Sequence, residues 1–507
     1  MISQLGEKLY LTILIISIPT LLLLLWYRGT SKGSKPPLPP GPYGLPIVGY
    51  LPFLKPNLHL TFTNMAHRYG PIFSLWLGSK LHVVVNTADL AKVVVRDMDQ
   101  NFANRDPPLT GLTISYGGLD VVFSNHKHWR DMRKLLASQV LSNANLHATR
   151  SLRTNGVRKM LRDVHGRIGT EININKVAYD TEIDVVTEML WGCSKGYDDY
   201  GGVGDEFQEV ALETIRLFAA ANISDIIPML SRFDLQGRER DIRKCKEHLD
   251  RIFENIIRGR INANSRKMDK DERKDFLQVL LDEKDDPTSS IDINQIKAIL
   301  VDVILGTIDT TSTMVEWVMT EVLYNPRVMT KIQKELGDVI GPNNIVEESH
   351  LSNLTYLDAV IKETLRLLPA GPLLLPRCPD ESCTVGGYTI PKGSIVYVNA
   401  WAIHRDPKNW TNPLEFNPER FLNTKWDYQG NNLKFLPFGS GRRKCPGAIL
   451  GEKMVMYLVA SLLHSFDWSL TKDEDFDLSQ EFDIAMRKKK QLIVIPTPRL
   501  SDASLYL

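Results

Sequence analysis

Apolar and polar positions along this chain follow a helical period over most of its length. Residues 91–368 repeat apolar positions at three- and four-residue intervals, which predicts helices. Residues 72–77 and 81–86 are two short apolar runs separated by a glycine-containing turn, which predicts a β-hairpin. Residues 385–398 and 491–496 return to strand-like patterning. The pattern therefore predicts a mainly α fold with a minor β-sheet region (α+β).

Two helical runs stand out because they are apolar with few interruptions. Residues 296–305 carry only Lys297 and Asp302 as charges, and residues 448–463 form a second apolar helix. Residues 265–274 are instead a charged run without an apolar face, which predicts a solvated loop. No second linker follows residue 43, so we expect residues 43–507 to form one large catalytic domain with these two helices at its centre.

The N-terminus carries a candidate membrane segment. Residues 9–27 are 19 residues without a charge, about 28 Å as a helix at roughly 1.5 Å per residue. This length suits the ~30 Å hydrocarbon core of a bilayer. Basic residues follow the segment, so residues 1–28 are predicted to be an anchor with the rest of the chain in the cytosol. A cleaved signal peptide is the alternative. Residues 29–42, basic and proline-rich, are predicted to be a stiff hinge, or else a surface linker with no orienting role.

Composition narrows the class of protein further. The formal net charge is +1, from 61 basic and 60 acidic residues, which gives no electrostatic basis for binding nucleic acid. The five cysteines are odd in number and show no paired spacing, which argues against a disulfide framework and favours a reducing compartment. Cys378 and Cys383 could suggest a metal clip, but two unrelated thiols is the better interpretation.

The most informative stretch is residues 438–447, FGSGRRKCPG, directly before the second apolar helix. Its glycines let backbone N–H groups approach the sulfur of Cys445. Those amides and the following helix N-terminus favour a thiolate. With no second ligand cysteine nearby, a single thiolate suits haem better than zinc. A structural cysteine in a loop is the alternative.

The spacing F-x-x-G-x-R-x-C-x-G in this loop resembles that of the cytochrome P-450 monooxygenases. The matching residues are Phe438, Gly441, Arg443, Cys445 and Gly447. The resemblance implies haem b with the Cys445 thiolate as axial iron ligand. It extends to plant microsomal members of the family, including those that oxidise terpenoids.

A second motif lies in the first apolar helix. Gly306, Asp309, Thr310 and Thr311 match the family pattern [AG]-G-x-[DE]-T-[TS], whereas Thr307 stands where a second glycine is usual. By the resemblance, Thr310 hydrogen-bonds dioxygen and Asp309 helps to bring protons to it. The alternative is a helix with ordinary Ser and Thr bonds to its own backbone.

A third motif is predicted to be structural. Glu363 and Arg366 lie three residues apart on a predicted helix over residues 356–368, so their side chains can pair in bidentate geometry. With Pro418-Glu419-Arg420-Phe421 they resemble the family's E-x-x-R and P-E-R-F arrangement, in which Arg420 joins the pair and stabilises the cysteine loop.

The propionates of haem need cationic or N–H donors. The residues that match the family's propionate contacts are Trp129, Arg133, Arg377 and Arg443. His404 is the alternative haem contact, although a turn near residues 405–407 is its better assignment.

Substrate contacts are carried over from the family by position. The loop over residues 107–123 is expected to cap the site, and the proposed contacts are Leu112, Val301, Leu305, Gly306, Ala370, Leu374, Phe482 and Ile484. An apolar lining favours a small apolar substrate, a mono- or sesquiterpenoid. A flavonoid, another phenolic or an aldoxime is the alternative within the same chemistry.

The chain has no dinucleotide or flavin fingerprint, so electrons must come from a partner, by resemblance an NADPH-dependent flavoprotein reductase at the endoplasmic-reticulum membrane. A haem-thiolate isomerase or dehydratase, or a non-catalytic haem protein, is the alternative of another class.

Overall fold

A computed structural model gives the structure of residues 17, 36–192, 203–220, 222–264, 275–287, 291–471, 477–482 and 485–506. The predicted anchor, apart from residue 17, and the start of the hinge lie outside these described residues. The charged run 265–274 and Ile484 lie outside them as well, as does the side chain of Phe482.

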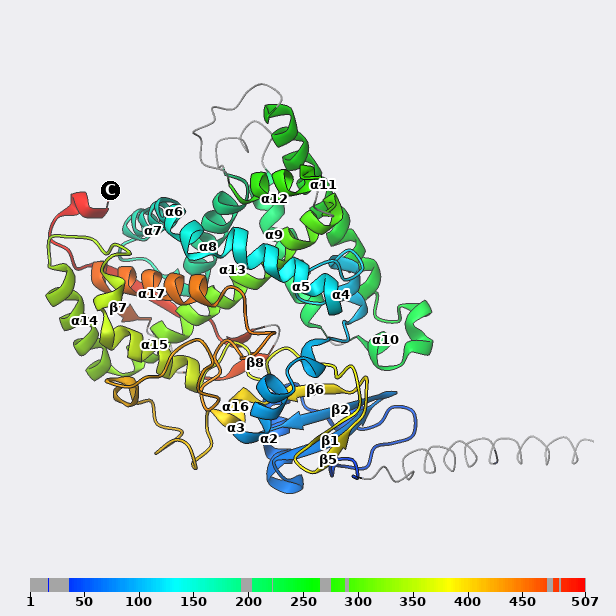
Figure 1. Ribbon diagram of the computed structural model, residues 1–507. Helices are drawn as coiled ribbons and strands as arrows, with labels where there is room; N and C mark the ends of the chain where they lie inside the picture. Colours follow the sequence, from blue (N-terminus) through cyan, green and yellow to red (C-terminus); the bar gives the residue numbers. More distant parts are fainter. Residues whose placement is uncertain are drawn as a thin grey trace, which may run out of the picture.

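Helix α13 (Ile293–Tyr324) runs through the middle of the helical part of the molecule (Figure 1). It begins at a capping box, in which Asp292 and Gln295 each satisfy a backbone N–H of the other. Helix α8 (Ile174–Trp191) and helix α17 (Ala448–Ser465) pack against it. The first half of α13 belongs to one hydrophobic core and the second half to another. This central position explains why α13 is apolar on nearly all its faces.

The remaining helices surround this centre or cover the sheet. They are α2 (Leu58–Tyr69), α3 (Ala88–Lys92), α4 (Leu109–Ile114), α5 (His126–Leu135), α6 (Asn143–Ala148), α7 (Arg150–His165), α9 (Val203–Ala219), α10 (Ile223–Ile226), α11 (Arg238–Asn264), α12 (Phe276–Asp285), α14 (Pro326–Ile340), α15 (Thr355–Leu367) and α16 (Ala400–Ile403). Among the described helices, α13 and α17 are long and apolar enough to cross a membrane, but both are mostly buried inside the protein, as core helices are.

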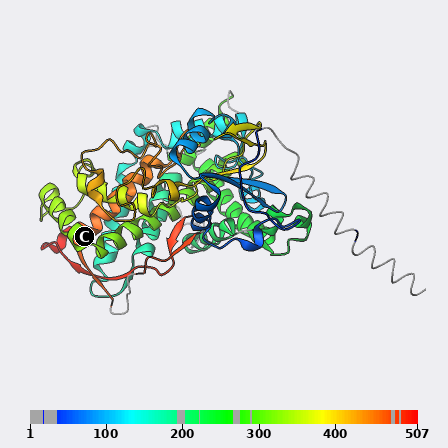
Figure 2. The same ribbon diagram turned by 90° about the horizontal axis from the view of Figure 1, so that it is seen from below.

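One sheet has the order β1 (Ile72–Leu77), β2 (Lys80–Val85) and β6 (Ile395–Val398), with β2 and β6 parallel. This sheet lies on the side of the molecule away from α14 and α17 (Figures 1 and 2). The smaller pairings involve β3 (Ile172–Asn173), β4 (Cys383–Val385), β5 (Tyr388–Ile390), β7 (Phe466–Leu470), β8 (Gln480–Phe482), β9 (Met486–Lys488) and β10 (Ile493–Pro498). Strand β7, in contrast, lies beside α14 and α17 (Figure 1).

The predicted hairpin is confirmed, with Leu77 opposite Lys80 across the turn. The last predicted strand starts later than expected, at Ile493 rather than at residue 491. The backbone N–H of Leu492 explains this shift, because it donates to Glu316 Oε1 at 2.7 Å instead of joining a strand ladder. The mainly α architecture with small sheets is therefore as predicted.

The proline-rich segment is bonded to the sheets. Ser74 donates from its backbone N–H to Pro40 O at 2.8 Å and from its hydroxyl to Pro39 O at 2.7 Å. Thr389 donates from its backbone N–H to Pro37 O at 2.9 Å. A Cβ at Gly41 would lie 1.7 Å from Ser74 O, so only glycine allows this close approach to β1. Hydrogen bonds thus fix the described part of the predicted hinge to the sheets of the protein.

Candidate active site

The cysteine loop folds tightly around Cys445 just before α17. The backbone N–H of Cys445 donates to Phe438 O at 3.0 Å, which closes the loop. Gly439 and Gly441 have φ values of 71° and 72°, a region that favours glycine. A Cβ at Gly441 would lie 1.8 Å from Val95 O, so the loop also needs glycine for close packing. Both glycines are therefore needed for the tight loop that precedes Cys445.

Burial raises the pKa of the Cys445 thiol, and three groups oppose this shift. The backbone N–H of Gly447 and the charges of Arg133 and Lys444 all lower the pKa. Cys445 is half-buried as a residue, and the fixed donor and cations around its sulfur partly offset the cost that burial imposes on a thiolate. A thiolate in this setting is a soft ligand, suited to iron.

His404 fixes the segment that leads into the loop. It is fully buried, and its Nε2 accepts the backbone N–H of Leu436 at 2.8 Å. Burial, followed by the charges of Arg366 and Arg405, lowers the pKa of His404 to about 3. A neutral imidazole that accepts a backbone bond is a structural group, so the assignment of His404 to the turn region is the better one.

Four arginines converge above the cysteine loop. Arg105, Arg133, Arg377 and Arg443 come from four separate segments, and burial lowers the pKa of each. The charges of neighbouring arginines lower the pKa of Arg105 and Arg443 further. A cluster of like charges in a buried place is unfavourable unless an anion compensates it.

Protein carboxylates only partly balance this cluster. Asp120 and Asp302 lie near it and hydrogen-bond to each other. Burial raises the pKa of Asp120 to about 6 and that of Asp302 well above its usual range. The two carboxyl groups are therefore inclined to share a proton, and they leave the arginine cluster short of negative charge.

Buried N–H donors without a partner in the arginine cluster indicate where a compensating anion would bind. Buried N–H groups without a partner include Trp129 Nε1, Arg105 Nε and Arg377 Nη1. The two propionates of a haem would supply both the missing acceptors and the missing negative charge. The residues of the site therefore fit haem, with Trp129 and Arg377 where the sequence predicted donors.

Arg443 makes more protein contacts than predicted. Its guanidinium donates to the backbone oxygens of Ala103 and Ser124, each at 2.5 Å, and to Val121 O at 3.0 Å. Its Cζ lies 4.2 Å from the ring centre of Trp129. Arg443 thus ties the cysteine loop to the residues that precede α5, besides being a predicted propionate contact.

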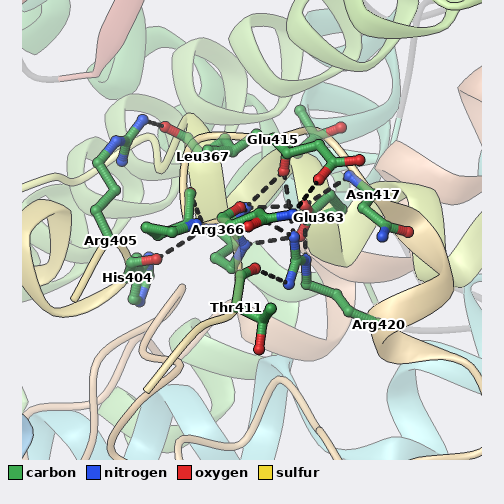
Figure 3. A network of polar contacts seen from close by, with 12 residues as sticks. Glu363, Arg366, Leu367, His404, Arg405, Thr411, Glu415, Asn417 and Arg420 are labelled. Atoms are coloured by element: carbon green, nitrogen blue, oxygen red, sulfur yellow. Dashed lines mark hydrogen bonds and ion pairs between the residues drawn. The ribbon is translucent and has the colours of Figure 1, made fainter. Parts of the chain in front are cut away.

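Behind the loop, Glu363 and Arg366 form a fully buried ion pair (Figure 3). Arg366 Nε lies 2.7 Å from Glu363 Oε2, and Arg366 Nη2 lies 2.8 Å from Glu363 Oε1. Arg420 Nε and the backbone N–H of Asn417 also donate to Oε1, at 2.9 and 2.8 Å. Arg366 Nη1 in turn donates to His404 O at 2.8 Å. This geometry brings the three predicted structural residues together.

Asp309 and Thr310 lie in the middle of α13. The Thr310 hydroxyl donates to Gly306 O at 2.9 Å, so α13 continues through the motif with an ordinary bond to its own backbone. Asp309 is buried on the helix and forms an ion pair with Arg487 of β9, with 2.7 Å between Oδ1 and Nη2. The two side chains therefore have different surroundings, although they are adjacent in sequence.

The predicted substrate contacts lie on several elements. Val301 is buried, Leu305 and Leu112 are half-buried, and Gly306 is exposed. The other described candidates lie near the loop and the hairpin: a Cβ at Gly439 would lie 3.6 Å from Leu374 Cδ1, and Ala370 O accepts the backbone N–H of Met486. Phe482 pairs with Met486 across the β8–β9 hairpin.

Sequence reasoning missed Arg105, the Asp120–Asp302 pair and the Arg487 partner of Asp309. Each depends on a contact between segments far apart in the chain, and no local spacing signals it. In the sequence, Asp302 is only one of two charges in an apolar run, but in the structure its Oδ2 accepts the backbone N–H of Val121 at 2.6 Å. That bond attaches the predicted capping loop to α13.

Comparison with known proteins gives the family. The family model described as Cytochrome P450 matches residues 39–495. Cytochrome P450 76C2 of Arabidopsis thaliana is 36% identical over 482 residues, which cover 93% of this chain and 94% of that protein. Flavonoid 3'-monooxygenase of Crocosmia x crocosmiiflora is 37% identical over 512 residues, with 97% and 99% covered. Carnosic acid synthase of Salvia pomifera is 36% identical over 472 residues, with 90% and 93% covered.

A solved structure of a zebra fish cytochrome P450 with progesterone is 25% identical. It has a TM-score of 0.75 and matches 88% of this chain and 100% of that one. The chain belongs to the cytochrome P450 family. It is a plant-type monooxygenase and an oxidoreductase. Its cofactor is haem b with a cysteine thiolate ligand, and it depends on O2 and a redox partner.

Proposed function

We propose that this monooxygenase hydroxylates a small apolar plant metabolite, a mono- or sesquiterpenoid, with electrons from NADPH through a flavoprotein reductase. The observation that carries the substrate class is the lining expected around the site, where Leu112, Val301, Leu305, Ala370 and Leu374 are all apolar. The carboxylate nearest to them along α13, that of Asp302, already bonds to the protein backbone. The binding free energy of a substrate is therefore expected to come chiefly from apolar burial and shape complementarity.

A flavonoid or another phenolic is the second candidate. It is favoured by the similarity to flavonoid 3'-monooxygenase and to geranylhydroquinone 3''-hydroxylase of Arnebia euchroma, the latter 35% identical over 484 residues. An aldoxime is a third candidate, which rests on the sequence resemblance alone. The three classes differ in polar groups, so a direct turnover assay separates them.

In the proposed mechanism, Cys445 would bind the haem iron through its thiolate, and Trp129, Arg133, Arg377 and Arg443 would hold the propionates. When bound, the haem supplies the redox-active iron at which dioxygen is reduced. The arginines orient the group and neutralise its carboxylates. Overall, one O2, two electrons and two protons convert a C–H bond of the substrate to C–OH and yield one water.

We propose that Thr310 and Asp309 carry the protons. The Thr310 hydroxyl can donate a hydrogen bond after it turns from Gly306 O, to which it is now bonded. Asp309 can accept a proton from solvent and pass it on, because a carboxylate is a competent acid and base. Thr307 adds a side chain to α13 where the family usually has glycine.

The test is NADPH-dependent product formation in microsomes that contain this chain and a plant reductase. Mono- and sesquiterpenes, flavonoids and aldoximes are offered in parallel, and Cys445→Ala microsomes are the control. We expect oxygenated products from a terpene. Turnover of a flavonoid or an aldoxime alone would overturn the terpenoid assignment. Equal product in the Cys445→Ala control would overturn the role of Cys445.

We also propose that residues 1–28 anchor the chain in the endoplasmic-reticulum membrane and that residues 43–507 form the catalytic domain. Residues 29–42 are proposed to connect the two, with Pro37, Pro39 and Pro40 already bonded to the sheets of that domain. Exposed apolar side chains support a membrane-facing surface: Tyr43, Ile47, Met229 and Phe233 are all at least 64% exposed. Alkaline extraction of membranes and protease protection test this topology. We expect resistance to extraction and digestion of the body from the cytosolic side.

The reductase is proposed to dock over the cysteine loop. Arg442 and Lys444 both lie just before Cys445 in the loop. Arg442 is exposed and pairs with Asp99 at 3.2 Å between Nε and Oδ1, and Lys444 is half-buried. An acidic face of the partner would be attracted to this side. We expect Arg442→Glu to raise the reductase concentration needed for half-maximal turnover. An unchanged concentration would instead assign Arg442 to solubility.

A further inference from the structure

An arginine from the C-terminal part of the chain reaches the acid of α13. Arg487 Nη2 lies 2.7 Å from Asp309 Oδ1. The Asp309 side chain is only 5% exposed, whereas that of Arg487 is 30% exposed. A buried carboxylate stays ionised only where cations or N–H donors compensate the lost hydration. The pair therefore stabilises the charged form of Asp309 and fixes the direction in which its carboxylate points.

The residue before Arg487, Met486, is held in place by two hydrogen bonds to its backbone. The backbone N–H of Met486 donates to Ala370 O at 2.9 Å, and the indole N–H of Trp317 donates to Met486 O at 2.7 Å. Trp317 belongs to α13, so the hairpin is attached to the same helix that carries Asp309. These bonds fix the backbone next to Arg487 relative to α13, so its guanidinium is positioned beside Asp309.

Tyr179 of α8 lies within electrostatic range of the pair. The hydroxyl of Tyr179 is buried and has no hydrogen-bond partner. Burial, and then the charge of Asp309, raise the pKa of Tyr179, while Arg487 acts in the opposite direction. The phenol of Tyr179 is therefore neutral and lies within range of the charges of Asp309 and Arg487.

We propose that Arg487 is a positioning residue for the monooxygenase reaction. It holds the Asp309 carboxylate between proton transfers, and it thereby sets how much of the reduced dioxygen ends in product rather than in peroxide. The inference rests on the proposed role of Asp309 in proton supply. In the productive reaction, O2, two electrons and two protons hydroxylate one C–H bond and give one water. In the unproductive one, the same electrons and protons give one H2O2 and leave the substrate unchanged.

The physical reason lies in the two states of the carboxylate. With Arg487 in place, Asp309 gives up a proton readily, because the ionised form is stabilised. Without the arginine, a buried carboxyl group favours its protonated form and turns toward other donors, so it returns protons slowly. Hydrogen bonds to a charged group are worth enough to change such a rate by roughly tenfold.

The first experiment compares Arg487→Met, Arg487→Lys and a control, Lys489→Met. Lys489 lies on the same hairpin, and its side chain is exposed, so the control removes one positive charge without touching Asp309. Product and peroxide per NADPH and the solvent isotope effect on turnover are measured in holoenzyme that shows the reduced carbonyl thiolate Soret band. We expect Arg487→Met to lower the ratio of product to peroxide by roughly tenfold and to raise the isotope effect. Arg487→Lys should recover part of the ratio, and Lys489→Met should leave it unchanged.

A purely structural role for Arg487 would give a different pattern. Arg487→Met would then raise KM for the substrate while the ratio of product to peroxide stayed at the wild-type value, and that result would overturn the proposal. So would a Lys489→Met variant that loses as much product as Arg487→Met, because net charge alone would then explain the effect.

The second experiment does not depend on turnover. Hydrogen exchange of the amides in residues 486–488 is compared between the wild-type holoenzyme and Asp309→Asn, without substrate. We expect faster exchange in Asp309→Asn because the ion pair is lost; unchanged protection would contradict the contact. Failures of the two ideas are distinguishable. If Asp309→Asn leaves product per NADPH unchanged, the proposed role of Asp309 fails. If Asp309→Asn leaks peroxide and Arg487→Met does not, only the role of Arg487 fails.

Discussion

Glu363→Gln is the most decisive test of the network behind the cysteine loop. The carboxylate of Glu363 is fully buried and accepts from two atoms of Arg366, from Arg420 and from the backbone of Asn417. Glutamine keeps one acceptor oxygen but removes the negative charge and places an NH2 group against a guanidinium. The fully buried Arg366 then lacks its counter-charge (Figure 3).

Breaking a buried ion pair by removing one partner costs about 3–5 kcal/mol. Folded domains are stable by only about 5–15 kcal/mol, so the variant should lose a large part of its stability. The matched control is Glu419→Gln, in the neighbouring turn. Glu419 pairs with Lys331, and their side chains are 43% and 55% exposed. Such a surface pair is worth about 0–1 kcal/mol.

The assay is urea unfolding of the detergent-solubilised holoenzyme, followed by the reduced carbonyl thiolate Soret band. We expect a much lower midpoint and faster haem loss for Glu363→Gln, and a midpoint close to wild type for Glu419→Gln. Arg420→Gln supplies a milder variant if Glu363→Gln does not accumulate, since the Arg420 side chain is 12% exposed and lies at the edge of the network. Equal losses in Glu363→Gln and Glu419→Gln would refute the reasoning.

Four further outcomes can be checked. Cys445→Ala should lose the reduced carbonyl thiolate Soret band, and retention of that band would contradict its assignment as the ligand. Thr310→Ala should keep haem but leak peroxide; an unchanged product yield per NADPH would argue against its role. Gly441→Ala, with a backbone carbonyl 1.8 Å from the new Cβ, should lose far more haem occupancy than Gly393→Ala, which has a similar positive φ but no atom within 4 Å. Burial lowers the pKa of His404 from 6.5 to about 3, so its contribution to stability is full above pH 6.5 and is lost as the pH falls toward 3, by up to about 1.4 kcal/mol per pH unit; acid titration of unfolding should be steeper for wild type than for His404→Gln.

Local patterns predicted what depends on neighbours in sequence. The hairpin at residues 72–85 follows from two short apolar runs around a glycine-containing turn, and the Glu363–Arg366 pair follows from a three-residue helical spacing. The cysteine loop could be predicted because its glycines are needed by the loop itself. In each case the residues that define the feature lie within a few positions of one another, so spacing alone constrains the geometry.

Contacts between distant segments could not be predicted in this way. Arg105 joins the arginine cluster because its guanidinium donates to Pro376 O at 2.9 Å, a partner some 270 positions away. The start of β10 shifts because a glutamate of α13 takes the backbone N–H of Leu492. Neither contact leaves a periodic or local trace in the sequence, since any polar residue at the right place in space could have supplied it.

The attachment of the proline-rich segment has a practical consequence for shortened versions of this enzyme. The carbonyl groups of Pro37, Pro39 and Pro40 accept hydrogen bonds from Ser74 and Thr389. A truncation designed at the sequence boundary near residue 43 would strip these acceptors from two sheets and expose the edge of β1. A truncation just before Pro36 removes the apolar N-terminal segment and keeps the edge of β1 covered. The cleaner cut for crystallisation or directed evolution thus lies upstream of the prolines.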